Sequence, residues 1–409
     1  MTRQLKIAIF SGSIPSTTFI ENVIEGVANY HQVYLFGVLS KETLYPKNVT
    51  IFKTPQKHFS NFIYSTYRVL LLLKSNPKDL ILLYNEIKKY KKVYDRWIWF
   101  TKFLPIVLYR PDILHIQWAR DIEFYYFLKE KFNCKIIVSL LGSHINYTPL
   151  IDPKVGEIYK RIFSKVDAFH AVSKAIAIEA TKYGAKENDI KIIYSPIKSN
   201  TFKRFRIKII NKKNTIKLLS VGRHHWVKGY QYGIQSINIL KKQGFECEYT
   251  ILAEGIVPEN LLFMTSQLGI SENIVFKSGL NQQELFDILH QYDILLLPSL
   301  SEGIANVVLE AMALGIPVIS TDCGGMPEVV KHKETGWLVP VRDSNAIADA
   351  VVEITQTSES ELQRITQNAH EFVKTHFNAE DSIRLFLELY EAVYSSSNGK
   401  IPTSLHSSE

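Results

Sequence analysis

The sequence predicts an α/β protein made of two domains, each built on a sheet of parallel strands. Three observations lead to this prediction. The chain has 409 residues, 46% of them hydrophobic, which is more than one typical domain needs. Short apolar runs recur along the chain, and each is followed by a polar turn and then by apolar residues at helical spacing. A polar, basic stretch near the middle separates two sets of such runs.

The clearest strand–loop–helix units lie in the second half. The apolar run 293–297 predicts a buried strand, and 304–314 carries apolar residues at helical spacing. A second strand over 318–320 leads through Gly324-Gly325 into a helix predicted to begin at Pro327. Ligands of parallel sheets bind at the carboxyl ends of the strands, so the two loops should lie on one rim. These loops comprise residues 302–306 and 321–326.

Further strands are predicted before and after these units, and several end in turns that could face a ligand. In the first half they cover residues 5–10, 32–38, 49–53, 112–117, 135–140, 167–172 and 190–194. Gly12 follows the first of them and lets the backbone approach a ligand closely. His144 follows the strand 135–140 and suits a ligand contact or a proton relay, although a solvated histidine is the alternative.

The stretch 60–109 interleaves cationic and aromatic residues on apolar helical segments. Lys88, Lys89, Lys91 and Lys92 precede the aromatic run 97–100. Lysine stems over apolar surface, with Trp at headgroup depth, are typical of a membrane interface. The alternative is a set of domain-packing helices whose lysines face water.

A basic stretch over residues 201–214 is interpreted as the linker between an N-terminal domain (1–205) and a C-terminal domain (206–375). Seven Lys and Arg between residues 203 and 217 could instead form a basic patch. A last amphipathic helix, within 376–395, is predicted to cross back onto the first domain, and 396–409 to form a flexible tail.

The second half opens with a strand at 217–221, followed by a loop that carries Arg223 and Lys228 before a helix from Tyr230. Two cations beside a helix N-terminus suit a diphosphate, because helix amides and a guanidinium fork both favour phosphate oxygens. Strands at 248–252 and 273–276 end near Gly255 and Ser278, which extends the rim.

Charge and cysteine content narrow the classes of function. The net charge is +8, but residues 1–200 hold 29 Lys and Arg against 16 Asp and Glu. That basic half predicts an anionic partner such as a phosphorylated lipid, a membrane face or a nucleic acid, and a merely lysine-rich composition is the alternative. No nucleic-acid reading motif is recognisable. Three cysteines without metal-ligand spacing favour a reducing cytoplasm, and no run predicts a secretory signal or a membrane span.

Five ordered blocks carry a resemblance to a known family. Glu302-Gly303 precedes Glu310 with seven residues between the two glutamates, and the loop holds Val221-Gly222-Arg223 and Lys228-Gly229. The other blocks are 324–328, 335–339 and 167–173. The chain resembles, over nearly its whole length, the GT-B glycosyltransferases of the large retaining family four (glycosyl transferases group 1). The resemblance implies two Rossmann-like domains whose parallel sheets face each other across a cleft.

The resemblance also implies roles for individual residues. Glu302 would contact the hydroxyls of the donor sugar, helped by the backbone amides of Gly303, Ile304 and Ala305. Glu310 would bind the nucleotide ribose, while Arg223 and Lys228 would neutralise the diphosphate. The family generally needs no metal, and the co-substrate would be a UDP or GDP sugar. Many relatives have a histidine where this chain has Leu141, so His144 does not match that position.

The expected function is a retaining, metal-independent transfer of a hexose from a nucleotide sugar to a glycan or a polyprenyl-diphosphate-linked oligosaccharide. Bacterial surface polysaccharide synthesis, for lipopolysaccharide or capsule, is the expected context. The enzyme would be cytoplasmic and peripheral on the inner face of the cell membrane, in contact with anionic lipid and with no nucleic acid. The alternatives are a GT-B-shaped epimerase or phosphorylase, and a non-catalytic subunit that binds sugar nucleotides.

Overall fold

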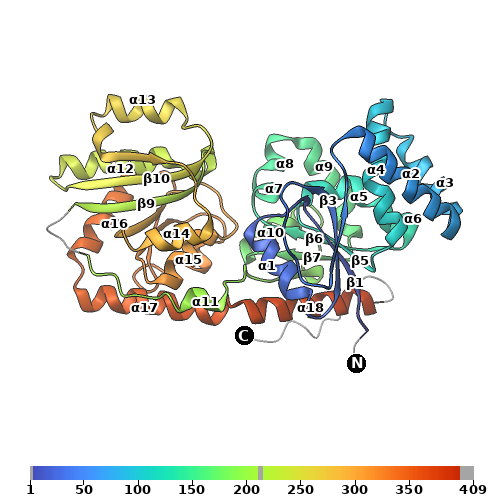
Figure 1. The fold of residues 1–409 in the computed structure, drawn as a ribbon. Coiled ribbons are helices and arrows are strands. Elements are labelled where there is room, and N and C mark those ends of the chain that lie inside the picture. The colour runs from blue at the N-terminus through green and yellow to red at the C-terminus, as the bar shows by residue number, and fades with distance from the viewer. Residues whose placement is uncertain (1–2, 211–214, 397–409) are drawn as a thin grey trace. The chain divides into compact units, whose positions relative to one another are not determined.

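The computed structural model describes residues 3–210 and 215–396, and they form two compact units (Figure 1). The first unit comprises the described residues up to Val172, then Ile176–Pro196 and the chain from Ala379 onward. The second comprises Ser173–Ala175 and Ile197–Asn378. The chain therefore passes between the units near Pro196 and again near Asn378. The predicted tail 396–409 lies outside the described residues, apart from Ser396.

The first unit contains a sheet of parallel strands in the order β2-β3-β1-β5-β6-β7-β8, with β4 also paired to β3. The strands are β1 (Lys6–Phe10), β2 (Gly12–Ile14), β3 (Gln32–Leu39), β4 (Val49–Lys53), β5 (Ile113–Ile116), β6 (Lys135–Leu140), β7 (Ala168–Ala171) and β8 (Ile190–Ile192). Their apolar residues are buried because helices cover both faces of a parallel sheet. One prediction is wrong in detail, since Gly12 opens the short strand β2 instead of lying in a loop.

The helices of the first unit connect these strands and cover the sheet. They are α1 (Thr18–Val27), α2 (His58–Ser75), α3 (Pro77–Ile87), α4 (Val93–Tyr109), α5 (Ile122–Tyr125), α6 (Phe127–Phe132), α7 (Ser143–Asn146), α8 (Thr148–Ile151), α9 (Pro153–Ile162), α10 (Lys174–Thr181) and α18 (Ala379–Ser395). Helix α18 packs against α1 so closely that a Cβ at Gly26 would lie 2.5 Å from Ile383. The last helix of the described residues thus completes the first unit.

A buried polar network also joins α18 to the first sheet. His115 Nδ1 lies 2.8 Å from the Tyr390 hydroxyl, and His115 Nε2 lies 2.8 Å from Ser139 Oγ. His170 Nδ1 also lies 2.9 Å from Ser139 Oγ, and His170 Nε2 lies 2.9 Å from the Ile193 carbonyl oxygen. Complete burial lowers the pKa of His170 to about 4 and that of His115 well below its ordinary value. Both imidazoles are therefore neutral at physiological pH.

The second unit contains a parallel sheet in the order β11-β10-β9-β12-β13-β14. The strands are β9 (Ile216–Arg223), β10 (Cys247–Glu254), β11 (Ile274–Lys277), β12 (Ile294–Leu297), β13 (Val318–Thr321) and β14 (Trp337–Val339). The helices are α11 (Ser199–Phe202), α12 (Tyr230–Lys242), α13 (Glu259–Gln267), α14 (Gln282–Leu289), α15 (Asn306–Leu314), α16 (Ser344–Gln356) and α17 (Glu359–His376). The predicted α/β class with parallel sheets is confirmed in both units. The strand order reverses between β9 and β12, which is where such sheets bind ligands.

The basic stretch that we interpreted as a solvated linker is packed on the second unit in its described part. Thr201 is buried, and the Arg206 N–H donates to the Leu314 carbonyl at 3.1 Å. Arg204 pairs with Asp287 at 2.9 Å, and Lys208 pairs with Asp293 at 3.0 Å. The prediction of a solvated linker is wrong for residues 201–210, since Thr201 is buried and two of their cations, Arg204 and Lys208, pair with acidic residues of this unit. Residues 211–214 lie outside the described residues.

No helix within the described ranges is both long enough and apolar enough to cross a membrane.

Candidate functional site

Two loops meet at the point where the strand order of the second unit reverses. One follows β9 and ends at Gly229, and the other follows β12 and begins at Pro298. Gly229 has a φ of +62°, and a Cβ on it would lie 2.0 Å from the Pro298 carbonyl oxygen. Only glycine allows this approach, because any side chain would push the loops apart. The loop that carries Arg223 and Lys228 is thereby fixed against the loop that leads to Glu302.

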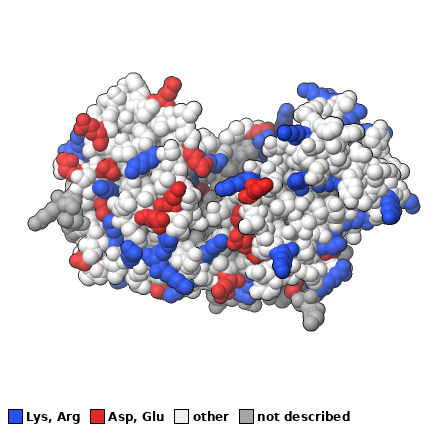
Figure 2. Space-filling view, in the orientation of Figure 1, with Lys and Arg blue, Asp and Glu red and all other residues white. Residues whose placement is uncertain are grey.

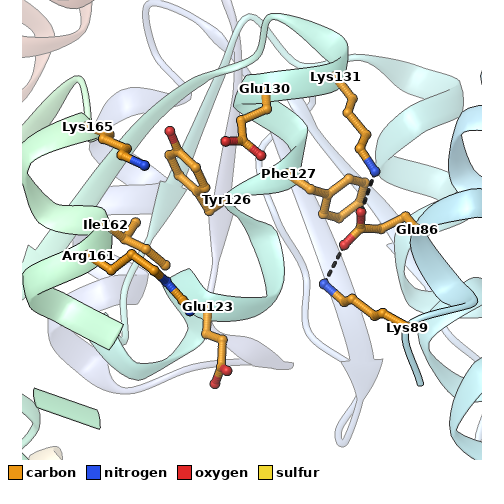
Figure 3. Close-up of a pocket in the computed structure, with 10 residues that line it drawn as sticks. All are labelled: Glu86, Lys89, Glu123, Tyr126, Phe127, Glu130, Lys131, Arg161, Ile162 and Lys165. Atoms are coloured by element: carbon orange, nitrogen blue, oxygen red, sulfur yellow. Dashed lines mark hydrogen bonds and ion pairs between the residues drawn. The ribbon is translucent and has the colours of Figure 1, made fainter. Parts of the chain in front are cut away.

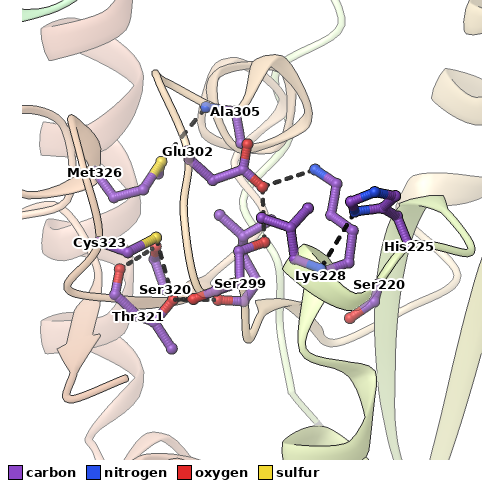
Figure 4. Close-up of polar contacts among 12 residues, drawn as sticks. Ser220, His225, Lys228, Ser299, Glu302, Ala305, Ser320, Thr321, Cys323 and Met326 are labelled. Atoms are coloured by element: carbon purple, nitrogen blue, oxygen red, sulfur yellow. Dashed lines mark hydrogen bonds and ion pairs between the residues drawn. The ribbon is translucent and has the colours of Figure 1, made fainter. Parts of the chain in front are cut away.

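Lys228 and Glu302 form an ion pair across these loops (Figure 4). Lys228 Nζ lies 2.7 Å from Glu302 Oε1, and the Ser299 hydroxyl donates to the same oxygen at 2.7 Å. The sequence suggested separate roles for these two residues, one toward a diphosphate and one toward a sugar. In the structure the two residues form an ion pair at the carboxyl ends of the strands. The side chains of Lys228 and Glu302 are 17% and 13% exposed.

The glycine pair after β13 packs directly on the loop that holds Glu302. A Cβ at Gly324 would lie 1.9 Å from the Glu302 carbonyl oxygen, and one at Gly325 would lie 2.1 Å from the Gly303 carbonyl oxygen. Two adjacent glycines therefore permit backbone-to-backbone contact between the loops. The prediction that 302–306 and 321–326 share a rim is confirmed.

Two predicted helix starts are wrong in this region. Helix α15 begins at Asn306, so Gly303, Ile304 and Ala305 lie in the buried loop before it. The Ala305 N–H donates to Met326 Sδ at 3.4 Å, a contact visible in Figure 4. The helix expected from Pro327 is only a single 3₁₀ turn over Met326–Glu328.

Arg223 lies exposed at the end of β9, where it faces Glu254 at the end of β10 in the strand register. Within the described part of the chain, no ion pair is formed by Arg223. The nearby Tyr230 hydroxyl is buried without a hydrogen-bond partner among the described residues. Burial, followed by the charge of Glu302, raises the pKa of Tyr230 above its ordinary value. A guanidinium and a neutral hydroxyl thus stand beside the Lys228–Glu302 pair.

Glu310 lies on α15 and is almost completely buried. Gln282, at the start of α14, donates from Nε2 to Glu310 Oε1 at 2.5 Å. Burial raises the pKa of Glu310 to about 7, and the hydrogen bond from Gln282 opposes that shift. A carboxyl group buried without a cation is costly for a folded chain, so it marks a place where a ligand hydroxyl could bind.

The remaining residues predicted for this rim are exposed at the ends of their strands. Gly255 follows β10 with a φ of +96°, and Ser278 follows β11. A Cβ at the next residue, Gly279, would lie 2.6 Å from Glu254 Cγ, so these two turns are adjacent. The structure therefore brings both residues to the same sheet edge as Arg223.

In the first unit, the two residues predicted for ligand contact lie near Trp118, which follows β5. The Trp118 indole N–H donates to the Ser11 carbonyl at 3.1 Å, beside Gly12. The Trp118 ring centroid lies 5.6 Å from that of His144, which is on α7. The carboxyl ends of β1, β5 and β6 thus meet at one edge of the first sheet.

Sequence reasoning missed four side chains that belong to these two edges. Ser299 and Gln282 contact the two glutamates, while Trp118 and Asp121 follow β5. Burial raises the pKa of Asp121 to about 6, although Lys102 and Arg120 oppose the shift. Trp118 and Ser299 could have been found from the sequence, since each comes one or two residues after a predicted strand.

A separate pocket of about 290 Å³ lies among the helices of the first unit (Figure 3). Glu86 bridges Lys89 and Lys131 there, and Lys131 Nζ lies 2.6 Å from Glu86 Oε2. This ion pair joins α3 to α6 and accounts for the buried carboxylate. Among the residues that the structure describes, no three His, Cys, Asp or Glu side chains are grouped to hold a metal ion.

Comparison with known proteins relates these two units to enzymes of sugar transfer. Residues 201–372 match the family described as Glycosyl transferases group 1. A curated relative, the amylovoran biosynthesis glycosyltransferase AmsK of Erwinia amylovora, is 29% identical over 240 residues. That alignment covers 57% of this chain and 58% of the relative, so the chain spans less than two thirds of the relative's length.

Solved structures show the fold of the whole described chain. The sucrose-phosphate synthase of Thermosynechococcus elongatus matches with a TM-score of 0.74 at 16% identity, covering 97% of this chain and all of that one. Anabaena Alr3699/HepE in complex with UDP and glucose matches with a TM-score of 0.68 at 13% identity, covering 95% of this chain and all of that one. The chain therefore has the GT-B fold that the sequence resemblance implied.

Proposed function

We propose, from the match of residues 201–372 to the glycosyl transferases group 1 family, that this chain is a glycosyltransferase that uses a nucleotide-diphosphate sugar. The observation that carries the proposal is the Lys228–Glu302 pair, held at 2.7 Å where the strand order reverses. This is the position in a parallel sheet where nucleotides bind. The Anabaena structure with UDP and glucose supports a nucleotide donor of this type.

The second unit offers a group for each part of such a donor. Arg223 and Lys228 neutralise the diphosphate, and Glu302 accepts hydrogen bonds from hydroxyls of the sugar. Lys228 is shared between Glu302 and the phosphates, so it links the two halves of the donor. Glu310 accepts hydrogen bonds from the ribose, and Gln282 holds one of its oxygens in place. Gly303, Ile304 and Ala305 bring backbone close to the sugar.

The proposed transfer proceeds with retention of configuration at the sugar. Breaking the bond between the sugar and the phosphate leaves an oxocarbenium-like sugar and an anionic nucleotide. Positioned cations stabilise the charge where it develops, and typical effects of one such group are about 10²–10³ in rate. The donor's own phosphate then accepts the proton of the acceptor hydroxyl, which attacks from the same face. We expect turnover without an added divalent cation.

The acceptor is proposed to be a glycan or a lipid-linked oligosaccharide. The relative named for amylovoran biosynthesis supports a role in making a surface polysaccharide. The excess of 29 Lys and Arg over 16 Asp and Glu in residues 1–200 supports peripheral contact with the anionic inner face of a cell membrane. Gly12 and His144 are the residues proposed to face the acceptor.

Donor screening by thermal shift tests the site directly, because a ligand that binds only the folded state raises the Tm by mass action. We expect one UDP or GDP sugar to raise it in the native chain. In Arg223→Ala, Lys228→Ala and Glu302→Ala, that shift should shrink and sugar release should fall about 100-fold or more. Exposed Lys242→Ala, at the far end of α12, is the matched control.

Two outcomes would contradict the proposal. Full turnover in Lys228→Ala and Glu310→Ala would remove the site assignment. Conversion of the donor alone into an epimer, with no acceptor present, would show a nucleotide-sugar epimerase instead.

A further inference from the structure

Helix α2 buries polar side chains and exposes apolar ones, which is the reverse of the usual arrangement for a helix on a protein surface. The side chains that it buries include Asn61, Ser65 and Arg68, with Leu72. Its exposed face carries large apolar residues that recur at helical spacing and are between 46% and 77% exposed. These are Phe59, Phe62, Ile63, Tyr67, Leu70 and Leu73. A surface helix normally does the opposite and turns its apolar stripe to the core.

The inward face of α2 is held by polar contacts, which explains this orientation. Asn61 donates to Thr101 on α4 at 3.2 Å, and Ser65 donates to Asn61 at 3.4 Å. Arg68 donates to the Lys53 carbonyl at 3.1 Å. Buried polar groups that are hydrogen-bonded fix a single packing, because turning the helix would leave them without partners. The apolar face is therefore held outward by the fold.

The charges around the exposed face are almost all positive. Helix α2 contains no Asp or Glu, and Lys57 and Lys74 stand at its two ends. Between residues 53 and 102 there are eleven Lys and Arg against three Asp and Glu. Two of those three acids, Asp79 and Glu86, are buried in ion pairs with Arg110, Lys89 and Lys131. Figure 2 shows Lys and Arg side chains scattered over a mainly uncharged surface in the region of α2 to α4.

Aromatic side chains from α4 extend the apolar face at the start of α2. The Phe62 ring lies 6.2 Å from that of Trp97, and the His58 ring lies 5.9 Å from that of Tyr94, measured between centroids. Tyr94 is 60% exposed. Trp and Tyr are enriched at the headgroup level of bilayers, where an apolar ring and a polar edge are both accommodated.

We infer that α2 is a membrane anchor that lies in the plane of an anionic lipid leaflet. The inference deepens the proposed contact with a membrane and rests on it, but it does not depend on the transfer reaction. An 18-residue helix is about 27 Å long. Its Phe, Leu and Ile side chains enter the boundary between headgroups and acyl chains, while Lys57 and Lys74 contact lipid phosphates. An apolar face with a cationic border matches an anionic bilayer better than a second copy, which would bring the same positive charges together.

Flotation of the full chain with vesicles tests the inference. Vesicles of phosphatidylcholine mixed with phosphatidylglycerol should bind the native chain, and pure phosphatidylcholine and high salt should weaken binding. Phe62→Ser combined with Leu70→Ser should lower the partition coefficient about tenfold or more. The matched control is Leu262→Ser with Phe263→Ser on α13 in the second unit, whose side chains are 46% and 64% exposed.

A second test distinguishes the effect of the lysines beside α2 from the effect of the protein's net charge. Lys57→Glu with Lys74→Glu should lower binding about tenfold or more. The same double reversal at the exposed Lys186 and Lys242 changes the net charge equally and should have a much smaller effect. Circular dichroism and an unchanged Tm confirm that each variant is folded.

A label on α2 reports insertion directly. The three native cysteines are buried, so Thr66→Cys on the exposed side of α2 can be labelled alone with a polarity-sensitive dye. Its emission should shift to the blue on anionic vesicles, whereas a label at Ser266→Cys on α13 should not shift.

The outcomes are distinguishable. If the native chain does not float, the proposed membrane contact itself is wrong. If it floats but the α2 variants float equally well, only the assignment to α2 is overturned. If the chain dimerises in solution through this face, and the Phe62 and Leu70 changes make it monomeric without affecting flotation, the face binds a second copy instead.

Discussion

Replacing Glu310 with Gln should make the protein more stable above neutral pH while weakening nucleotide binding. The carboxyl group is buried, with one hydrogen bond from Gln282, and its pKa is about 7 instead of the model-compound value of 4.5. The Glu310 carboxyl group therefore stays protonated in the folded chain over a range of pH in which it is ionised in the unfolded chain. Stability from this group is fully present below 4.5 and is lost as the pH rises through about 7.

The size of the effect follows from the two pKa values. Because the carboxyl group ionises more readily in the unfolded chain, it lowers the free energy of unfolding relative to a group that stays protonated. The reduction is about 1.4 kcal/mol at about pH 5.5 and about 3.4 kcal/mol at about pH 8. Gln has a similar shape and does not titrate, so Glu310→Gln is free of this cost. Its advantage in free energy of unfolding over the native chain should thus grow by about 2 kcal/mol between those pH values.

Urea unfolding of both proteins across this pH range measures the difference, with exposed Glu272→Gln as the control. The same samples, tested with the preferred nucleotide, should show weaker binding for Glu310→Gln. A side chain whose removal stabilises the fold but weakens ligand binding is retained for the ligand. The reasoning would be refuted if the difference in free energy of unfolding between the two proteins did not change with pH. It would also be refuted if Glu310→Gln were less stable than the native chain at about pH 8.

Three further predictions follow from other parts of the structure. Gly229→Ala should destabilise the second unit by several kcal/mol, since its Cβ would lie 2.0 Å from the Pro298 carbonyl oxygen. The control is Gly244→Ala, which has a similar positive φ but no atom within 4 Å of the new Cβ, and should lower the free energy of unfolding by only about 1–2 kcal/mol. Thermal unfolding of the two variants measures the difference. His170, with a pKa of about 4, stays neutral in the folded chain while the unfolded chain takes up a proton below about 6.5, so it should contribute a fall of about 2 kcal/mol in the free energy of unfolding between about pH 7 and about pH 5. In urea titrations, His170→Gln should lack this part of the pH dependence. Ser299→Ala removes one hydrogen bond to Glu302 and should lower kcat/KM about five- to tenfold in a donor-turnover assay with no change in Tm, whereas an unchanged kcat/KM would show that this hydroxyl does not position Glu302.

The parallel strands could be predicted from the sequence because their apolar runs are buried on both faces and stand out from their surroundings. The run 135–140 coincides with β6, and 49–53 coincides with β4. The starts of helices near the site could not be predicted. Ala305 precedes α15 instead of lying in it, and its N–H donates to Met326, a contact between loops that no local pattern encodes.

Residues for the candidate site could be proposed from the sequence, but the contacts between them could not. Arg223 and Lys228 were predicted from their place on a strand-to-helix loop, whereas Glu302 and Glu310 were predicted from the resemblance to a known family. The pairing of Lys228 with Glu302 joins positions 74 residues apart and follows from the strand order, which no local pattern encodes. Similarly, the periodicity of α2 predicts a helix, but only its contacts with Thr101 and the Lys53 carbonyl decide which face is buried.

The position of α18 in the sequence has a consequence for how the protein is made on the ribosome. The first unit begins with the first described strand, yet it is completed only by Ala379–Ser395. At 5–20 residues per second, the intervening part of the chain takes roughly 10–40 s to synthesise. During that interval the groove beside Gly26 and the imidazole of His115 lack their covering helix, while the second unit can already fold. The order of translation therefore makes the first unit the last to finish, and a premature stop directly after Asn378 leaves its apolar face open to chaperones and proteases.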